Sequence, residues 1–481
     1  MNFVIPSFAP AVPEMVLLAL ISTVLIADTF WSKRFQFATY YATQISLLVV
    51  GFLIFSSFSS EQVITFNGSF VRDSFSDVLK LFTIAVSMGV FFFAREYLMQ
   101  QKFYSGEFFV LGLFSVLGMF VMISAHNMIT MYLGLEVMSL ALYAMVALRK
   151  DSGHALEAAL KYFVLGALAT GMLLYGFSMI YGATGSITFP EIANIITEGK
   201  ADSQVLAFGV VFVVIGLAFK LGAVPFHMWV PDVYHGSPTA VTLFLGTAPK
   251  IAGFAMLYRL LAEGMPGLIE DWQQLIIMLS ILSMFVGATV AIVQDNLKRM
   301  LAYSGIGHMG FLLLGVIAAT PEGYAASMFY VVVYAITGVA GFGMIVALSR
   351  PGNEFDLIAN FKGLNVRNPW LALMMMIIMF SMAGIPPFIG FWAKIIVIEE
   401  VVKAGFTWIA VVAVIAAVIS AFYYLKIVKA MYFDEPEDSS KLEPISSNLA
   451  VGVSTAALLL VVLGLMPSSM IEMFYLSLNA A

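Results

Sequence analysis

The sequence predicts an all-α polytopic membrane protein with about fourteen transmembrane helices. Of the 481 residues, 61% are hydrophobic and only 11% are charged, whereas a typical soluble domain is about 25% charged. The mean hydropathy is +0.97, and apolar runs long enough to cross a bilayer recur along the chain. Too few polar side chains are present to cover a water-facing surface, so we expect lipid to cover much of it.

Composition also excludes several kinds of site. The chain contains no cysteine, which excludes disulfides, thiolate metal sites and iron–sulfur clusters held by this chain. The net charge of -6 and the lack of a basic stripe give no indication of a nucleic-acid partner. The N-terminal sequence MNFVIPSFAPAVPE lacks the positive segment of a cleaved signal peptide, so the first apolar run is predicted to be a retained helix.

Fourteen segments meet or approach the length of about 20 apolar residues that a helix needs to cross the hydrocarbon core. In chain order they are Val12 to Phe30, Phe37 to Ser57, Ser76 to Phe93, Glu107 to Ala125, Asn127 to Leu148, Leu156 to Gly182, Gln204 to Trp229, Pro238 to Leu261, Trp272 to Val293, Ala302 to Ala319, Gly323 to Ser349, Trp370 to Val401, Phe406 to Tyr432 and Ile445 to Leu465.

The loops between these segments carry an uneven charge, which predicts the orientation. Loops after odd-numbered segments contain thirteen Lys and Arg residues, and loops after even-numbered segments contain four. The basic side of a membrane protein faces the cytoplasm, so both termini are predicted to be periplasmic. The thirteen are Lys33, Arg34, Arg95, Lys102, Arg149, Lys150, Lys298, Arg299, Arg350, Lys362, Arg367, Lys429 and Lys441, and the four are Arg72, Lys200, Arg259 and Lys403.

One loop, near residues 62–73, is predicted to form an external β-hairpin. Its sequence VITFNGSFVRD alternates apolar and polar residues around Asn67-Gly68, a dipeptide typical of a type I′ turn. The alternative is an irregular loop.

Two stretches of the sequence resemble each other and indicate an internal repeat. Lys220 is followed by GAVPFHMW, residues 222–229, and Lys394 is preceded by GIPPFIGFW, residues 384–392. A second echo pairs ALATG, residues 167–171, with YAITG, residues 334–338. The offsets span five helices, an odd number, so the two copies are predicted to be inverted relative to each other, as in many transporters.

This repeat divides the chain into four predicted regions. Residues 1–106 hold the first three helices and the hairpin, residues 107–261 the first repeat, residues 262–433 the second, inverted repeat, and residues 434–481 the last helix. Glycine and proline interrupt one helix in each repeat, and broken backbone at membrane depth is tolerated where it is buried in protein or faces water. A simple proline kink is the alternative.

Four ionisable residues lie deep in the apolar segments: Glu136, Lys220, Lys250 and Lys394. A charge at the bilayer centre costs at least about 2.5 kcal/mol on insertion scales. A structural ion pair is one explanation, but three lysines face a single glutamate. Because burial disfavours the ammonium and a nearby carboxylate favours it, we predict a relay of protonatable groups wetted by internal water. Lys80, Lys161 and Lys426 lie nearer segment ends, where snorkelling of the amine to the interface explains them. For Lys161 the alternative is a pair with Glu157, which lies four residues before it on the same helix face.

Histidines add a weaker signal. His308 lies within the tenth segment, 172 positions after Glu136, and could hand protons along the relay or be a hydrogen-bonded core residue. His227 and His235 flank Asp232 between the seventh and eighth segments, where they could admit protons or belong to a polar turn.

Two other functions agree less well with the sequence. A haem-binding membrane cytochrome needs pairs of axial histidines facing each other from membrane helices, and of the five histidines only His308 is clearly inside an apolar segment. A structural scaffold leaves the central lysines without a role. The five histidines are His126, His154, His227, His235 and His308.

The stretch FKLGAVPFHMWVPDVYHGSPTAV, residues 219–241, followed by APKIAGF, residues 248–254, resembles the antiporter-like membrane subunits of bacterial respiratory NADH:quinone oxidoreductase (complex I). The family also includes subunits of Mrp-type cation/proton antiporters, which are the alternative. The PDVYHGSP sequence, the lysine at Lys394 and the chain end after the fourteenth segment distinguish this chain from subunits L and M of that complex.

The resemblance implies roles for individual residues. Glu136 and Lys220 match the family's glutamate–lysine pair, Lys250 its connecting lysine and Lys394 its distal lysine, and His308 is placed beside them. The implied function is proton translocation in the bacterial inner membrane. The resemblance implies no cofactor in this chain; NADH, FMN, iron–sulfur clusters and quinone belong to partner subunits. Expected partners are subunit M, small membrane subunits such as K and J, and the lipid bilayer.

Overall fold

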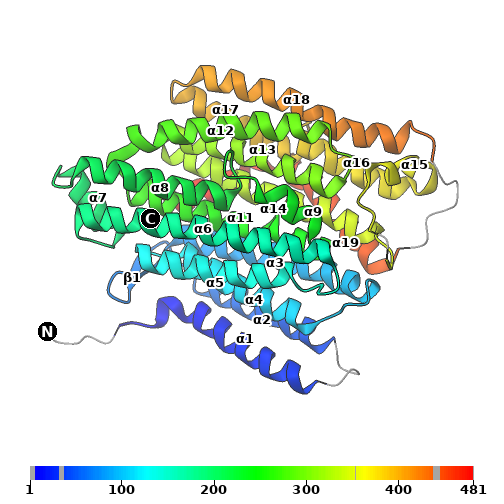
Figure 1. Cartoon of the computed structure of the whole chain (residues 1–481), viewed down its shortest axis with the longest axis horizontal. Coiled ribbons are helices and arrows are strands. Elements are labelled where there is room, and N and C mark those ends of the chain that lie inside the picture. Colours follow the sequence, from blue (N-terminus) through cyan, green and yellow to red (C-terminus); the bar gives the residue numbers. More distant parts are fainter. Residues whose placement is uncertain (1–5, 32–36, 353, 437–444, 480–481) are drawn as a thin grey trace.

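In the computed structural model, residues 6–31, 37–352, 354–436 and 445–479 are described. Lys33, Arg34 and Lys441 of the loop-charge prediction lie outside these ranges. The described part is a bundle of helices that run side by side along one direction, with α1 (Val12–Phe30) at one edge and α18 (Thr407–Tyr432) at the other (Figure 1).

The N-terminal region contains the predicted hairpin. Its elements are η1 (Ala9–Ala11), α1 (Val12–Phe30), α2 (Ala38–Ser56), β1 (Val63–Thr65), β2 (Phe70–Arg72) and α3 (Ser74–Gln100). The strands pair antiparallel with Val63 opposite Arg72. Asn67 and Gly68 both have positive φ, and the amide of Ser69 donates to the carbonyl of Phe66 at 3.1 Å. These are the features of a type I′ turn, so the hairpin prediction is confirmed.

The middle of the chain contains the first helix that is broken within the membrane. Its elements are α4 (Gly106–Ile123), α5 (Met128–Val146), α6 (Gly153–Thr184), α7 (Phe189–Thr197), α8 (Ser203–Leu221), α9 (Trp229–Gly236), α10 (Thr239–Leu245), α11 (Ala248–Leu257) and the π-helical segment η3 (Tyr258–Glu263). The side chains of Asn127 and Asp202 cap α5 and α8 by accepting hydrogen bonds from backbone amides in the first turn.

The C-terminal half also contains a helix that is broken within the membrane. Its elements are η4 (Pro266–Leu268), α12 (Ile269–Ile292), α13 (Leu297–Ala318), α14 (Pro321–Leu348), η5 (Ile358–Phe361), α15 (Leu364–Arg367), α16 (Pro369–Ala383), α17 (Ile389–Lys403), α18 (Thr407–Tyr432), α19 (Ser447–Leu465) and α20 (Pro467–Asn479). In Figure 1, α14 lies near the centre of the bundle, and nearly all of its residues are buried.

The predicted all-α membrane fold is confirmed. Within the described ranges, 13 helices are long and apolar enough to cross a membrane. The remaining predicted segment, Trp370 to Val401, is divided between α16 and α17, which are shorter. One local prediction was incomplete: residues 229–236, where we considered a polar turn, form the helix α9, because its Trp229 and Val230 are buried against the bundle.

Both broken helices end on a glycine with positive φ. Gly222 follows α8 with φ +80°, and Gly384 follows α16 with φ +85°. Such a conformation is strained for any residue with a Cβ atom, so glycine ends each helix at membrane depth. Prolines in the following residues, which lack an amide hydrogen, keep the helix from resuming at once.

Close glycine crossings occur in both halves of the chain. A Cβ atom on Gly118 of α4 would lie 2.4 Å from the amide nitrogen of Met138 of α5. A Cβ atom on Gly287 of α12 would lie 2.5 Å from the amide nitrogen of Gly307 of α13. Both helix pairs therefore approach more closely than side chains would permit, and their equivalent positions are consistent with the predicted repeat.

Both ends of the described chain lie at the hairpin end of the bundle. The hydroxyl of Thr65 in β1 donates to the carbonyl of Ser7 at 2.6 Å. Leu476 of α20 lines one cavity together with Ser74 at the start of α3. This arrangement fits an even number of membrane crossings; which side the ends face stays a prediction.

Two basic residues differ from their predicted roles. Lys80 was assigned to snorkelling, but its side chain is 1% exposed and forms a 2.6 Å ion pair with Glu14 of α1. Arg259 was assigned to an outer loop, but it is fully buried in the π-helical segment η3 and pairs with Asp73 at 2.8 Å. Glu14 and Asp73 are both far away in the sequence, so only the tertiary structure reveals these two pairs, although Arg259 also forms a local pair with Glu263.

Candidate functional site

Lys220 lies in the last turn of α8 and points toward α5. Its side chain is buried, and Nζ donates a hydrogen bond to Oγ of Ser139 at 2.8 Å. Glu136 lies three residues before Ser139, on the same face of α5. Among the described residues, Glu136 and Lys220 do not form an ion pair, and Oε1 of Glu136 is buried without a hydrogen-bond partner. Ser139 therefore holds Lys220 one helical turn from Glu136, without a hydrogen bond to that glutamate.

Lys250 lies in α11, and its amine binds the C-terminal end of α8. Its amine donates to the backbone carbonyl of Leu221 at 2.8 Å and to that of Lys220 at 3.4 Å. It also lies 5.3 Å from the ring centroid of Trp229. The C-terminus of a helix carries partial negative charge, and an aromatic face attracts cations, so both contacts stabilise the ammonium form.

Lys394, in α17, has nearly the same surroundings in the other half of the chain. Its amine donates to the carbonyls of Ala383 at 2.8 Å and Met382 at 3.0 Å, at the end of α16. It lies 5.3 Å from the ring centroid of Phe311. At each break, therefore, a buried lysine donates hydrogen bonds to two backbone carbonyls at the end of the helix and lies over one aromatic ring.

His308 of α13 is held between two tyrosines. Nδ1 lies 2.7 Å from the hydroxyl of Tyr330, and Nε2 lies 3.0 Å from the hydroxyl of Tyr424. The hydroxyl of Tyr424 is in turn hydrogen-bonded to Ser304. Because each hydroxyl can donate or accept, both protonation states of the imidazole can be satisfied. No local sequence pattern predicts these partners, since the tyrosines lie on α14 and α18.

Two small cavities flank His308. The first, of about 20 Å³, is lined by Tyr334 and Thr337 of α14 and reaches Met382 at the α16 break. The second, of about 10 Å³, is shared by His308 and Lys394. A water molecule needs about 10–15 Å³ of such space and several polar partners, so each cavity is about the size of one water. His308 and Lys394 thus line one small chamber, the second of these cavities.

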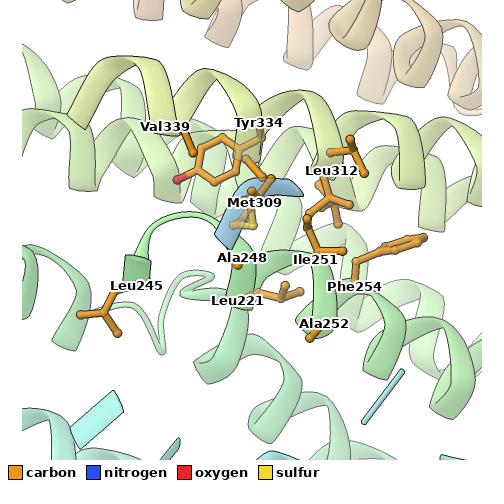
Figure 2. Close-up of a cluster of buried hydrophobic side chains, with 14 of the residues drawn as sticks. Leu221, Leu245, Ala248, Ile251, Ala252, Phe254, Met309, Leu312, Tyr334 and Val339 are labelled. Atoms are coloured by element: carbon orange, nitrogen blue, oxygen red, sulfur yellow. The ribbon is translucent and has the colours of Figure 1, made fainter. Parts of the chain in front are cut away.

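The two groups of predicted residues are separated by apolar side chains. Figure 2 shows Leu221, Ala248 and Ile251 near α8 and α11 packed against Met309 and Leu312 of α13. Tyr334 of α14 lies at the edge of this cluster, and its ring centroid is 5.3 Å from that of His308. The structure therefore brings Glu136, Lys220 and Lys250 together on one side, and His308 and Lys394 on the other.

A charged network lies at the end of the bundle opposite the hairpin. Asp232 of α9 binds Lys161 of α6 and Arg299 of α13, each at 2.8 Å. Burial opposes its ionisation, but the two cations bring the pKa of Asp232 below its usual range. Burial lowers the pKa of His235, and the nearby Lys298 lowers it further. These residues tie α9 to both halves of the chain.

Glu354 completes this network in the loop after α14. Its carboxylate accepts hydrogen bonds from Tyr97 and Thr239, and forms a 3.0 Å ion pair with Lys298. Lys298 also donates to the carbonyl of Ser237 at 2.9 Å. Four elements are therefore joined at the start of α10. No group of three His, Cys, Asp or Glu residues gathers to hold a metal ion in the described part of the chain.

Comparison with known proteins gives consistent matches. Residues 125–420 match the family model described as the transmembrane region of NADH:quinone oxidoreductase and Mrp antiporter proteins. The chain is 73% identical to NADH-quinone oxidoreductase subunit N of Hydrogenovibrio crunogenus, over 99% of this chain and 100% of that protein. It is 50% identical to the subunit of the same name from Nitrosomonas europaea, over 100% of this chain and 99% of that one.

Solved structures share the fold. A chain of respiratory complex I from Thermus thermophilus with bound aureothin has a TM-score of 0.82 and 30% identity, covering 96% of this chain and 98% of that one. A chain of the Mrp complex from Dietzia sp. DQ12-45-1b has a TM-score of 0.82 and 21% identity, covering 98% and 96%. At that lower identity the second match concerns the fold alone.

Proposed function

Because this chain belongs to the family of NADH:quinone oxidoreductase and Mrp antiporter membrane subunits, we propose that it is subunit N of a bacterial NADH:quinone oxidoreductase and translocates protons. The 73% identity to a subunit N over almost the whole chain supports this assignment. The redox reaction, with its NADH, FMN, iron–sulfur clusters and quinone, is then carried out by other subunits. Subunit M and small membrane subunits such as K and J are the proposed neighbours.

The observation that carries the proposal is the surroundings of the three buried lysines. Within the described ranges, Lys220, Lys250 and Lys394 are bound by a hydroxyl or by backbone carbonyls instead of carboxylates. A lysine bound to a carboxylate would leave a buried negative charge when it lost its proton, which is costly. A lysine bound to neutral acceptors leaves none, so it can exchange protons during turnover.

Glu136 is the proposed control of Lys220. Its unpartnered Oε1 lies one turn from Ser139, which accepts the hydrogen bond from Lys220. A carboxylate that moves toward the amine favours the ammonium, and one that moves away favours proton release. Ser139 can accept from the ammonium or donate to the neutral amine, so it accommodates both states.

The end of α8 links Lys220 to Lys250. Lys250 donates to the carbonyl of Lys220 itself, so a shift of this helix end changes the surroundings of both amines together. We propose that protons pass between them through water that enters the α8 break when it opens.

The apolar cluster of Figure 2 is the proposed barrier between the two halves. We place this cluster, which includes Met309 and Leu312 of α13, between Lys250 and the cavity lined by His308 and Lys394. A proton can cross this layer only if water or a hydroxyl bridges it, because bare hydrocarbon cannot carry a proton. Without water, the cluster prevents passive leakage of protons between the halves. When water enters it transiently, proton transfer becomes possible.

We also propose four regions in the chain: residues 1–106, 107–261, 262–433 and 434–481, of which the central two are inverted repeats. We further propose that the protein lies in the bacterial inner membrane with both termini in the periplasm. The breaks after α8 and α16, each with a lysine at the helix end, support the repeat. An Mrp-type antiporter subunit remains the alternative, but the match to an Mrp complex is only 21% identical.

Purification through an affinity tag on this chain tests the assignment. We expect the tag to recover a large membrane assembly that oxidises NADH with quinone, and we expect the same assembly to pump protons after reconstitution. Recovery of a cation/proton antiporter assembly without NADH oxidation would contradict the assignment and favour the alternative.

A further inference from the structure

A large apolar groove runs along the membrane-spanning surface, away from the buried lysines. It has a volume of about 810 Å³ and is lined by α3, α14, α19 and α20. Its floor is formed by Ile336 and Val339 of α14, and its walls include Phe92 of α3 and Ala456 of α19. Three of these helices, α3, α14 and α19, are long and apolar enough to cross a membrane, so hydrocarbon must fill the groove when lipid surrounds the protein.

A bend in the last transmembrane helix shapes the groove. α19 ends at Leu465 and α20 begins at Pro467, whose ring prevents an unbroken helix. Leu463 lines the groove before the bend, and Met470 and Met473 line it after the bend. The groove is therefore built by the fold of this chain and does not depend on a loop.

The groove opens into a polar mouth toward the hairpin end of the bundle. A second cavity of about 570 Å³ shares Ser469 and Met473 with the groove. Its lining adds the hydroxyls of Ser60 and Ser74 and the carboxylate of Glu472. An apolar channel that ends in a polar mouth has the shape and polarity of an amphiphile with a hydrocarbon chain and a polar headgroup.

The charge of the mouth determines which kind of polar headgroup can bind there. Glu472 is the one ionisable residue among the described residues that line it. A carboxylate attracts an ammonium group and repels an anionic headgroup. Serine hydroxyls can donate hydrogen bonds to phosphate oxygens. These groups together suit a zwitterionic phospholipid that carries a primary amine.

The bend argues against a neighbouring helix as the occupant. A helix with its side chains is a straight rod about 10 Å across, whereas this groove bends where α19 gives way to α20. A volume of about 810 Å³ lies within the range of roughly 300–1,000 Å³ that holds small ligands. A flexible acyl chain also follows a bent channel, which a rigid helix does not.

We propose that this groove binds one phospholipid with a primary-amine headgroup, whose acyl chain packs on α14 and whose amine contacts Glu472. The site has a direct relation to the first cavity beside His308, because Ile336 and Val339 line the groove while Tyr334 and Thr337, on the same helix, line that cavity. The lipid supports α14 from outside the cavity.

Lipid retention by the intact assembly tests this proposal. The assembly is purified through this chain from nanodiscs containing equal amounts of phosphatidylethanolamine and phosphatidylglycerol, and bound lipid is counted by mass spectrometry. We expect one strongly retained phosphatidylethanolamine per chain, favoured about fivefold over phosphatidylglycerol, as one partly exposed charge pair allows. Ala456→Trp should fill the groove and lose this lipid, whereas the matched control Leu458→Trp, on the exposed side of α19, should keep it.

The headgroup contact has its own variant. Glu472→Gln should retain a lipid but lose the preference for phosphatidylethanolamine. Equal retention by the parent protein and by Ala456→Trp would overturn the lipid site. A preference for phosphatidylglycerol, or a cross-link that places a neighbouring subunit's helix in the groove, would overturn the assigned occupant. The readout does not require pumping, so it stays informative if the assembly proves to be an antiporter.

Discussion

The amine of Lys250 donates a hydrogen bond of 2.8 Å to the backbone carbonyl of Leu221, the last residue of α8. This contact places a buried cation on the negative end of the broken helix, at the point where the chain turns through Gly222. Lys394 has the same relation to Ala383 at the end of α16. Movement of either break would therefore change the electrostatic surroundings of the lysine bound to it.

Coupling between Glu136 and Lys220 is the first prediction. We expect Glu136→Ala and Lys220→Ala each to reduce quinone-linked proton pumping strongly, and the double variant to lose little more, because the two residues act as one unit. Ser139→Ala removes only the hydroxyl that accepts a hydrogen bond from Lys220, so it should reduce pumping less. Pumping in reconstituted vesicles, normalised to assembled protein, measures this. Simple addition of the logarithmic losses would show that the residues act independently.

The buried pair of Arg259 and Asp73 should be important for stability. Both side chains are fully buried and 2.8 Å apart, and removing one partner of such a pair leaves an uncompensated charge that costs about 3–5 kcal/mol. We expect Arg259→Leu to lower the thermal unfolding temperature and the amount of folded chain in the membrane. Lys200→Met, which breaks the exposed pair with Glu198, is the matched control and should cost less than about 1 kcal/mol. Equal effects of the two variants would contradict this ranking.

The network around Glu354 should make stability dependent on pH. Burial opposes ionisation of this carboxyl, but Lys298 and the hydrogen bonds from Thr239 and Tyr97 bring its pKa below the usual value. A carboxyl with a lowered folded-state pKa stabilises the protein above its unfolded pKa, about 4.3, and this stabilisation is lost as pH falls through the folded pKa.

Glu354→Gln should therefore destabilise the protein by about 1–3 kcal/mol at pH 7. The difference from the parent should stay constant down to about pH 5 and shrink below about pH 4. Thermal unfolding at several pH values measures this difference. A difference that grows on acidification would have the wrong sign.

Membrane orientation can be tested directly, because the chain has no cysteine of its own. Ser60 lies exposed near the hairpin, and Asp151 lies exposed in the loop between α5 and α6. With both termini in the periplasm, Ser60→Cys should react with an impermeant thiol reagent in intact spheroplasts, and Asp151→Cys should react only after the membrane is opened. The reverse order of labelling would invert the orientation.

Much of the fold could be predicted from the sequence because the signals are local. The length of each apolar segment fixes a membrane helix, and Asn67-Gly68 fixes the hairpin turn. The breaks after Leu221 and Ala383 could also be predicted, since glycine and proline stand next to a lysine in both places.

The partners of the charged residues could not be predicted in the same way. Glu14 and Lys80 form their pair across α1 and α3, and the tyrosines that bind His308 lie 22 and 116 residues after it. Helix α9 could not be predicted, because the run of residues that forms it is short and ends close to the next interruption of the helices. Such relations arise from packing between distant segments, for which a single sequence carries no local pattern.

Replacement of the lysines by arginine tests the proton relay most directly. Arginine keeps the positive charge but stays protonated at physiological pH, so Lys250→Arg and Lys394→Arg should assemble yet lose at least about tenfold in proton pumping, as for loss of an acid–base group. Lys→Ala variants give the loss on full removal, and Lys403→Arg, at an exposed ion pair, is the neutral control. Arginine variants that are assembled, as judged by recovery of the whole complex, and pump like the parent would contradict the relay.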